Sequence, residues 1–566
     1  MLKSYDNFIK LATQTKISNP ELFLKRKKEI CKNLGLPLPT NADIRELYEK
    51  MILEKKIKRN PDLENCLFSK KIRTDSGVAV VAVLTKSYPC PGKCIYCPDE
   101  LEMPKSYLSN EPAVMRAISA KFNPYLQVQR RIHALELNGH KTDKIEIIVM
   151  GGTFSYLPKA YQNKFILECF RACNDYPKSK NKEQGTRNNI KIKLENEQKK
   201  NETAKHRVVG LTLETRPDYI DSEELINFRN LGCTRVELGV QSIFDDVLEK
   251  NKRGHDVQRT IEATKLLKDF GFKINYHIMP GLLGSSVKKD FQMFEKLFSD
   301  SNFQPDMLKI YPTIVIRQSP LYKIWKTGKY KALTDKSFEK FILRVKNEII
   351  PPYVRISRLV RDVPENSILA GPKISNLRQL IAKNSTCPCI RCREVRADYS
   401  LKDLPAMLRS LNNSDDNISS QKLKSKQQNK YSIAMQAGKI ILNRIDYPAS
   451  NGQEIFLEYT NQDRSKLFAL LRLRINNEKS IVPNILKNSA IIREVHTYGK
   501  MNQINQKDNV SPQHIGLGKK LILEAEKIAK KEFNLDKIVV ISGVGVRGYY
   551  RKLGYKLKDS YMVKKL

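Results

Sequence analysis

Three cysteines lie close together in the first fifth of the chain, Cys90, Cys94 and Cys97, with the spacing CxxxCxxC. They follow an apolar segment at residues 77–84 that is typical of a buried strand. Three thiolates at this spacing can hold three iron corners of a 4Fe-4S cluster and leave the fourth iron open to another ligand. A structural zinc site and a chance grouping of cysteines are the alternative interpretations.

A second cysteine group, Cys387, Cys389 and Cys392, places three sulfur atoms within six residues. A closed structural zinc site has four ligands, so a fourth must come from elsewhere, and His496 is one candidate. We expect this group to bind zinc and to join two domains. Free buried thiols are the alternative, and a second iron–sulfur cluster fits less well because no predicted barrel strand leads into the group.

A third group lies near the C-terminus, where the segment Gln513-His514-Ile515-Gly516-Leu517-Gly518 precedes a predicted helix at 518–533. Glycines leave backbone amides free to face a pyrophosphate, and a helix N-terminus adds favourable positive potential. Downstream stand Tyr549 and Tyr550, and a phenol with a pKa of about 10 can act as a general acid. The alternative is a core aromatic pair beside an unrelated turn, and the spacing does not say which tyrosine would act.

The elements that must position these groups alternate between strands and amphipathic helices. Strands are predicted at 144–152, 207–215, 235–242, 272–281 and 306–313, and helices at 161–171, 222–231, 257–270 and 288–298. Together with the segment at 77–84, this alternation predicts at least six parallel βα units, and therefore an open or closed α/β barrel. The carboxyl ends of these strands, where βα barrels place their sites, carry Gly151, Gly152, Thr153, Glu214, Arg216, Glu237 and Gln241.

Shifts in composition divide the chain into five predicted regions. These are a basic N-terminal region at 1–75, the barrel at 76–345, a linker with the second cysteine group at 346–410, a polar linker insert at 411–432, and a C-terminal α/β domain at 433–566. The last region has predicted strands at 439–447, 454–461, 467–474 and 490–498. Residues 178–206 resemble a charged insertion in the barrel.

The net charge of the chain favours one class of binding partner. Of 566 residues, 101 are Lys or Arg and 61 are Asp or Glu, which gives a net charge of +40. Such an excess calls for a polyanion, with nucleic acid the first candidate, unless it reflects a lysine-rich genome.

No apolar run approaches the roughly 20 residues of a membrane-spanning helix, and the N-terminus lacks a signal core. Six of the 11 cysteines fall in the two groups typical of metal ligands and the other five are scattered, so we expect no membrane association and a cytoplasmic, reducing location.

The first cysteine group and the barrel resemble the radical S-adenosylmethionine (SAM) superfamily. The resemblance implies that the open iron chelates the amino and carboxylate groups of SAM. It implies that Gly151, Gly152 and Thr153 approach the methionine amino group. It also implies that Glu214, Arg216, Glu237 and Gln241 line the cofactor and substrate mouth.

The C-terminal region resembles the GNAT acetyltransferase fold. This resemblance implies that the loop at 513–518 grips the pyrophosphate of acetyl-CoA and that Tyr549 or Tyr550 protonates the leaving CoA thiolate. The expected fold is thus α/β throughout: a partial (β/α)6 radical SAM barrel and a GNAT domain, joined by a cysteine-rich linker.

The combination resembles one family, the catalytic subunit of Elongator and its single-chain relatives, the tRNA uridine carboxymethyltransferases. The strings that carry it include GLTLETRPD, ELGVQS, CPCIRCRE and ISGVGVRGYYRKLGY, and the likeness runs from about residue 35 to the C-terminus. The resemblance implies that a 5′-deoxyadenosyl radical takes hydrogen from the acetyl methyl group of acetyl-CoA. The carbon radical then adds to C5 of the wobble uridine, and re-oxidation of the adduct radical with loss of a proton, followed by thioester hydrolysis, leaves 5-carboxymethyluridine.

On this interpretation the tRNA anticodon stem-loop is the polyanionic partner. The basic N-terminal region and the stretch Arg355, Arg358 and Arg361 are expected to contact its phosphates, and Lys309 to contact the acyl group or a phosphate. A homodimer or Elongator-like partner subunits are compatible with the sequence. Two other functions are alternatives: a protein (histone) lysine acetyltransferase with a structural iron–sulfur barrel, and a non-catalytic RNA-binding scaffold.

Overall fold

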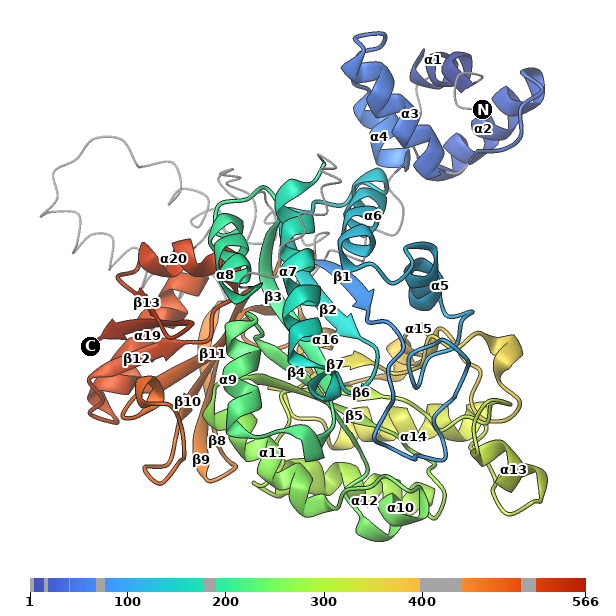
Figure 1. Cartoon of the computed structure of the whole chain (residues 1–566). Coiled ribbons are helices and arrows are strands. Elements are labelled where there is room, and N and C mark those ends of the chain that lie inside the picture. Colours follow the sequence, from blue (N-terminus) through green and yellow to red (C-terminus); the bar gives the residue numbers. More distant parts are fainter. Residues whose placement is uncertain are drawn as a thin grey trace, which may run out of the picture.

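The computed structural model describes residues 5–14, 19–39, 41–67, 77–177, 190–396, 440–499 and 516–566 (Figure 1). The predictions for the polar linker insert, for the first part of the charged insertion, and for Gln513, His514 and Ile515 lie outside these residues. Two seven-stranded sheets organise the rest of the chain. Within the described ranges, no helix is both long enough and apolar enough to cross a lipid bilayer.

The N-terminal region forms a small helical module. Its helices are α1 (Asp6–Gln14), α2 (Pro20–Asn33), α3 (Asn41–Leu53) and α4 (Pro61–Leu67). The module has its own apolar core, which includes Phe8, Phe23 and Tyr48. Figure 1 shows it projecting beyond helix α6 (Pro124–Leu137), which α3 contacts.

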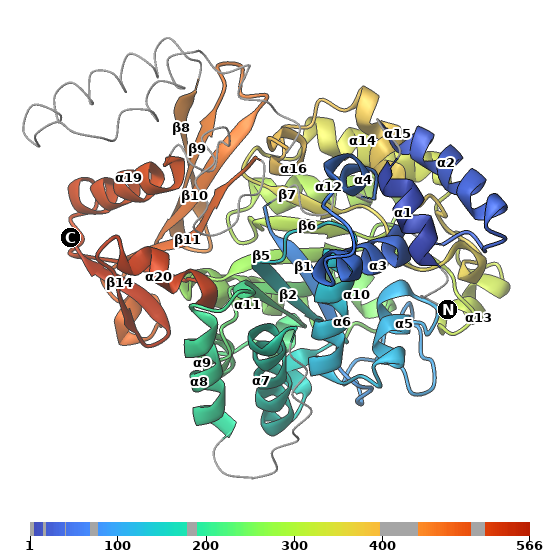
Figure 2. The same ribbon diagram turned by 90° about the horizontal axis from the view of Figure 1, so that it is seen from above.

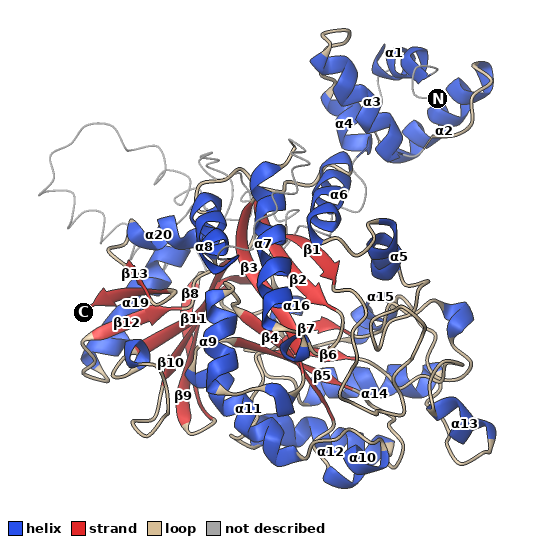
Figure 3. Cartoon of the chain, viewed as in Figure 1, coloured by secondary structure: helices blue, strands red, loops and turns tan. Residues whose placement is uncertain are grey.

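The first sheet is the barrel sheet, and all its strands are parallel and adjacent in chain order. Its strands are β1 (Ala79–Leu84), β2 (Lys144–Met150), β3 (Arg207–Thr215), β4 (Arg235–Gln241), β5 (Lys273–Ile278), β6 (Met307–Ile310) and β7 (Arg355–Arg358). The longer connecting helices are α7 (Lys159–Asp175), α8 (Ile190–Asn201), α9 (Ser222–Asn230), α11 (Val257–Asp269), α12 (Val287–Ser299) and α14 (Asp335–Glu348). They cover the outside of the curled sheet (Figure 3).

Short helices complete the loops of the barrel and the linker. They are α5 (Pro112–Ser119), α10 (Asp245–Lys250), α13 (Leu321–Lys326), α15 (Leu377–Leu380) and α16 (Ile390–Arg393). The expected α/β barrel is confirmed, with one addition: the sequence predicted at least six strands, and the sheet has seven. The seventh, β7, has only four residues, RISR, so it lacks the apolar run from which buried strands are predicted.

The C-terminal domain contains the second, mixed sheet. Strands β8 (Ile441–Ala449), β9 (Gly452–Thr460), β10 (Leu467–Ile475) and β11 (Ala490–Thr497) form an antiparallel meander. Strand β12 (Lys537–Val540) pairs parallel to β11, and β14 (Tyr561–Lys565) and β13 (Lys556–Lys558) complete the sheet. Helix α19 (Leu517–Lys531) packs against β9, β10, β11 and β12, and α20 (Arg547–Arg551) follows β12. This α/β arrangement agrees with the predicted fold class.

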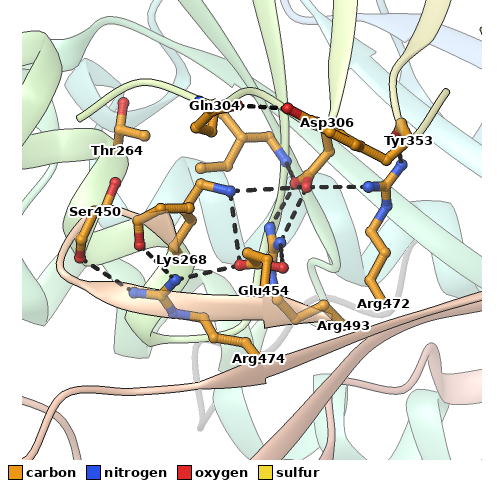
Figure 4. A network of polar contacts seen from close by, with 12 residues as sticks. Thr264, Lys268, Gln304, Asp306, Tyr353, Ser450, Glu454, Arg472, Arg474 and Arg493 are labelled. Atoms are coloured by element: carbon orange, nitrogen blue, oxygen red, sulfur yellow. Dashed lines mark hydrogen bonds and ion pairs between the residues drawn. The ribbon is translucent and has the colours of Figure 1, made fainter. Parts of the chain in front are cut away.

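The two sheets meet through a buried charged network (Figure 4). It lies at the end of the barrel opposite the carboxyl ends of its strands, since Asp306 and Tyr353 stand just before β6 and β7. Arg493 of β11 forms ion pairs with Asp306, just before β6, and with Glu454 of β9 at 2.8 Å. Arg472 of β10 donates to the Tyr353 carbonyl at 2.6 Å. These charged side chains are all but fully buried, at the contact where the C-terminal domain packs against the barrel (Figure 2).

The end of the predicted charged insertion takes part in the same contact between domains. Its residues 190–201 form α8, which packs on α7, and Glu202 follows directly. Glu202 accepts hydrogen bonds from Arg547 and Arg551 of the C-terminal domain, at 3.4 and 2.5 Å. This part of the insertion therefore joins the barrel to the second domain.

Candidate active site

A cavity of about 540 Å³ lies along the inner face of the barrel sheet. Residues from all seven barrel strands line it, together with Cys90, Cys94 and Cys97 from the loop after β1. The cysteines lie at the carboxyl end of the sheet, and the lining continues down to Arg355 of β7 and Arg391 of α16. The cavity thus connects the cysteine loop with the linker that leads to the C-terminal domain.

The cysteine loop surrounds its thiols with polar groups. Arg253 donates to the Cys94 sulfur at 3.4 Å, the Cys97 sulfur and the Ser106 hydroxyl lie 2.9 Å apart, and the Gly92 amide donates to Cys90 at 3.4 Å. The hydrogen bond from Cys97 and the charge of Arg253 lower the pKa of Cys94 to about 4, although burial opposes them. Because the thiolate is the form that binds iron, this environment prepares Cys94 as a ligand.

Beside the cysteine loop lies a buried polar atom that has no hydrogen-bond partner in the protein. Arg216 lies against the cysteine loop, since a Cβ on Gly92 would lie 2.2 Å from its Nη1, and this buried nitrogen has no hydrogen-bond partner. A buried, unpaired guanidinium nitrogen beside three thiols fits an anionic ligand such as a cluster sulfide or a carboxylate. The residues present therefore fit a 4Fe-4S cluster with a chelating cofactor.

The turn after β2 can only be built from glycine. Gly151 has φ +130°, and a Cβ there would lie 2.1 Å from the Thr85 hydroxyl. Gly152 also has a positive φ, and with Thr153 it lines the cavity, whereas Gly151 packs behind it. Close backbone approach at this turn is what a bound ligand amino group would need.

Strand β4 ends in an irregularity that aims Gln241 into the cavity. Its pairing with β5 shifts register between Leu238 and Gln241, and Gln241 has φ +69°, which is unusual for a residue with a side chain. The side chain lines the cavity near Arg253. Strained backbone of this kind concentrates at ligand-binding sites.

Inside the barrel, polar side chains from strands β3 to β6 and from the loop after β1 contact one another. Tyr107 donates to Glu214 at 2.8 Å, His277 lies 3.7 Å from Glu214 and 3.0 Å from Glu237, and Lys309 forms an ion pair with Glu237. Burial alone would raise the pKa of Glu237, but Lys309 and His277 outweigh it and hold that pKa well below its usual range. Glu237 is therefore a fixed negative charge that fixes Lys309.

The structure brings most of the predicted barrel residues together. Cys90, Cys94, Cys97, Gly152, Thr153, Glu214, Arg216, Glu237, Gln241 and Lys309 all line the one cavity. Sequence reasoning missed Tyr107, Arg253, Asn275, His277 and Arg391, which line it too. The alternation of Asn275 and His277 in the buried strand KINYHI was a usable signal, because polar residues two apart face the same side. Nothing local in the sequence marked Tyr107 or Arg253.

The arginines predicted to contact RNA phosphates differ in their surroundings. Arg355 is mostly buried and pairs with Glu394 at 2.6 Å, and Arg361 donates to the Ser106 carbonyl at 3.0 Å. Arg358 pairs with Asp362 at 2.5 Å, and its side chain is 44% exposed. Of the three, Arg358 is the one placed to meet a ligand from solvent.

The second cysteine group closes into a compact cluster. The sulfur atoms of Cys387, Cys389 and Cys392 all lie within 4.8 Å of one another. Among the described residues no histidine, carboxylate or further cysteine joins them, and the His496 ring instead lies 4.3 Å from that of Tyr498. The neighbouring Arg393 pairs with Glu458 of β9 at 2.8 Å. The cluster thus lies on the linker next to an ion pair that joins the linker to the C-terminal sheet.

The C-terminal domain brings its glycine turn and one tyrosine together. Gly516 caps α19 with φ +72°, and a Cβ on Gly518 would lie 3.6 Å from the Tyr549 hydroxyl and 3.5 Å from Thr497 of β11. Tyr550 is buried, whereas Tyr549 is 43% exposed. Tyr549 is therefore the tyrosine that faces the turn.

The two candidate sites are joined by one contact. Arg355, which lines the barrel cavity, donates to the Tyr498 hydroxyl at 3.2 Å. Tyr498 follows β11 directly, one residue beyond Thr497. The inner end of the cavity therefore lies next to the strand that forms the second site.

Comparisons with known proteins agree with this geometry. Residues 85–294 match the Radical SAM superfamily, and residues 305–386 match the Radical_SAM C-terminal domain. The tRNA uridine(34) acetyltransferase of Methanocaldococcus infernus is 43% identical over 94% of this chain and 92% of its own length. Human Elongator complex protein 3 is 38% identical over 88% of this chain and 86% of its own.

The chain belongs to the family of tRNA uridine(34) acetyltransferases and Elongator complex protein 3. A solved structure of the archaeal Methanocaldococcus infernus Elp3 with residues 1–46 deleted superimposes with a TM-score of 0.66 at 40% identity. It covers 87% of this chain and all of that one. The family assignment expected from the sequence motifs is thus confirmed.

Membership in the Elongator complex protein 3 family makes the chain an enzyme of the radical SAM and acyltransferase type. The superfamily match supports a 4Fe-4S cluster and SAM as cofactors, and the cavity with Cys90, Cys94 and Cys97 is the place that fits them.

Proposed function

We propose that this enzyme carboxymethylates C5 of the wobble uridine of tRNA, with acetyl-CoA as the source of the two carbons and SAM as the source of the radical. The observation that carries the proposal is the continuity of the barrel cavity. It contains the three cysteines at one end and Arg355 at the other, and Arg355 contacts Tyr498 beside the candidate acetyl-CoA site. A reaction that joins an acetyl unit to a radical acceptor needs the barrel cavity and the acetyl-CoA site to lie next to each other.

Each end of the cavity has a defined task in this proposal. Cys90, Cys94 and Cys97 would hold the cluster, which when bound supplies the electron that cleaves SAM. The unpaired nitrogen of Arg216 would bind an anionic part of the bound groups, and Thr153 with Gly152 would approach the methionine amino group. Lys309, held by Glu237, would orient the acyl oxygen or a phosphate, because a pinned ammonium keeps its charge and position.

In the C-terminal domain we assign the acid to Tyr549. The turn at Gly516 and Gly518 opens α19, whose N-terminal amides favour a pyrophosphate. The Tyr549 hydroxyl lies beside that turn and would deliver its proton to the CoA sulfur when the thioester is cleaved. Tyr550 would support it by packing beneath, with the two ring centroids 5.4 Å apart.

The remaining features fit the polyanionic substrate. The relatives are named for tRNA uridine(34), and the chain carries a net charge of +40. Helices α1 to α4, predicted to bind tRNA, and the exposed Arg358 would contact phosphates, so affinity should fall with salt. We further propose that Cys387, Cys389 and Cys392 bind zinc and hold the linker against the C-terminal sheet.

One experiment tests the function. Anaerobically reconstituted enzyme would be incubated with tRNA, acetyl-CoA, SAM and a reductant, and nucleosides would be separated by mass. We expect 5-carboxymethyluridine from the wild type and none from Cys94→Ala, with acetyl-CoA binding and the circular dichroism spectrum unchanged. Peptide acetylation without modified uridine would instead favour a protein lysine acetyltransferase. Modification by Cys94→Ala would contradict the radical route.

A further inference from the structure

Three tyrosines form a continuous aromatic cluster beside the mouth of the barrel. Tyr88, Tyr156 and Tyr219 come from the loops after β1, β2 and β3. Ring centroids are 6.4 Å apart for Tyr88 and Tyr156 and 5.5 Å apart for Tyr156 and Tyr219, with interplanar angles of 67° and 81°. Tyr156 is the central ring. We call these three residues the rim tyrosines.

The rim tyrosines remain open to solvent where a core pair would be covered. Tyr88 is 38% exposed and Tyr156 is 41% exposed, although most tyrosines in the described ranges are buried or nearly so. Edge-to-face contacts hold the rings in place without covering all of their faces. An exposed, fixed aromatic surface of this kind indicates a ligand that binds by stacking.

Their position is tied to the radical site. Tyr88 stands two residues before Cys90, Tyr156 follows the turn at Gly151 and Gly152, and Tyr219 follows Arg216. The three loops that would hold the cluster and SAM therefore also carry the rim tyrosines. None of the three rings lines the 540 Å³ cavity, so they lie outside it, beside the entrance. If a substrate base lay inside the cavity, the nucleotides next to it in the nucleic acid would lie beside the entrance, close to these rings.

Exposed lysines stand close to these tyrosines in the chain. Lys86 and Lys93 come from the loop after β1, and Lys159, which pairs with Glu224, begins α7 three residues after Tyr156. The Lys86 ammonium lies 5.4 Å from the centroid of the Tyr161 ring, next to this surface. Aromatic rings interleaved with lysines fit single-stranded nucleic acid, whose bases stack and whose phosphates are anionic.

We propose that the rim tyrosines are a stacking platform for the unpaired bases that flank the target uridine in an RNA loop. The inference rests on the proposed function, because it assumes that an RNA base enters the barrel. It adds the surface that separates a splayed-out base from its neighbours: the target enters the cavity while a flanking base rests on the exposed rings.

The test measures binding by the protein without cofactors, so it does not depend on turnover. The probe is an RNA hairpin with an unpaired loop that contains one uridine and, next to it, the fluorescent base 2-aminopurine. Affinity is measured at fixed salt for the wild type, Tyr156→Leu and Tyr156→Phe. The control is Ile481→Ser, which removes a side chain 78% exposed in the C-terminal domain.

We expect Tyr156→Leu to bind the hairpin about 10-fold more weakly, because one base–aromatic stack is lost. Tyr156→Phe keeps the ring and should bind as the wild type does, and Ile481→Ser should not differ either. Stacking on the rim tyrosines should quench 2-aminopurine in the wild type, Tyr156→Phe and Ile481→Ser, but not in Tyr156→Leu. Tyr88→Leu, at the other end of the cluster, should weaken binding as well, and thermal unfolding midpoints report whether each variant is folded.

The outcomes separate this inference from the proposed function. Wild-type affinity and quenching in folded Tyr156→Leu and Tyr88→Leu would overturn the stacking platform and leave the proposed function standing. Equal loss in Tyr156→Phe and Tyr156→Leu would also overturn it, because the hydroxyl and not the ring would then matter. If the wild type does not bind the hairpin, the proposed function itself fails.

Discussion

Arg355 of the barrel strand β7 donates a hydrogen bond to the hydroxyl of Tyr498, just beyond strand β11 of the C-terminal domain, at 3.2 Å. The same guanidinium pairs with Glu394 at 2.6 Å and lines the barrel cavity. One side chain therefore contacts the linker, the second domain and the cavity. It therefore links the barrel cavity to the strand of the second candidate site.

Arg355→Met should destabilise the protein by about 2 kcal/mol, because a buried carboxylate and a phenol lose a charged partner while Arg391 still pairs with Glu394. Denaturant unfolding monitored by hydrogen exchange at β7 and β11 measures this. Arg358→Met is the matched control, since its pair with Asp362 is nearly half exposed and should contribute less than about 1 kcal/mol. Equal effects of both changes would contradict the role given to Arg355.

Tyr549→Phe should lower the rate of acetyl-CoA thioester cleavage by about 100-fold or more while CoA binding is retained, because the proposed acid loses its proton. Tyr550→Phe should keep most of the activity, since Tyr550 is buried and the Tyr549 hydroxyl is the one that lies beside Gly518. Release of free CoA thiol, followed colorimetrically, distinguishes the two variants. The reverse ranking would assign the acid to Tyr550.

The free energy of unfolding of the wild type should include a contribution from Lys268 that increases as the pH rises from 8 to 10. Burial lowers the pKa of this lysine to about 8, and its Nζ lies 3.6 Å from Glu454 without a hydrogen-bond partner. An unfolded lysine titrates at about 10.4, so across this range the unfolded chain holds a proton that the native state has lost. Stability therefore rises with pH.

Lys268→Met should remove this contribution, and Lys265→Met, one turn earlier on α11 and partly exposed, should keep it. Urea unfolding of the three proteins at pH 7.5 and 9.5 gives the comparison. An unchanged pH dependence in Lys268→Met would mean that the buried lysine does not titrate there.

The two cysteine groups should bind different metals independently. Cys94→Ala should lose iron and its visible absorption but keep one zinc, whereas Cys389→Ala should lose zinc and keep iron, because the groups lie on separate loops and only the second is compact enough for one ion. Metal analysis of anaerobically purified protein measures both. Loss of both metals in either variant would contradict independent sites.

The sequence predicted some of the strands and residues that form the site, and missed others. The strands β2 to β6 were predictable because each lies in a segment rich in apolar residues between helix-like segments, and the residues at their ends then fall on one edge of a parallel sheet. Glu214, Glu237 and Lys309 were found in this way, and the cavity contains all three. Strand β7 was not found, because RISR has no such run and forms only against β6.

Other features have no local signal. Arg253 reaches Cys94 from a position 159 residues later in the chain, and Tyr107 reaches Glu214 across 107 residues. The network of Lys268, Asp306, Glu454 and Arg493 is made of residues that each look like solvated surface charges, and pairing across the domain interface alone makes their burial favourable.

The sequence by itself predicted the family from its motifs, the two cysteine groups from their spacing, and six of the seven barrel strands from their periodicity, because spacing and periodicity are local properties. The tertiary structure decided that Tyr549 rather than Tyr550 faces the glycine turn, that Arg355 is a buried connection between sites, and that three tyrosines meet beside the barrel mouth. These relationships depend on distances between loops and domains far apart in the chain, and only packing of the two sheets fixes such distances.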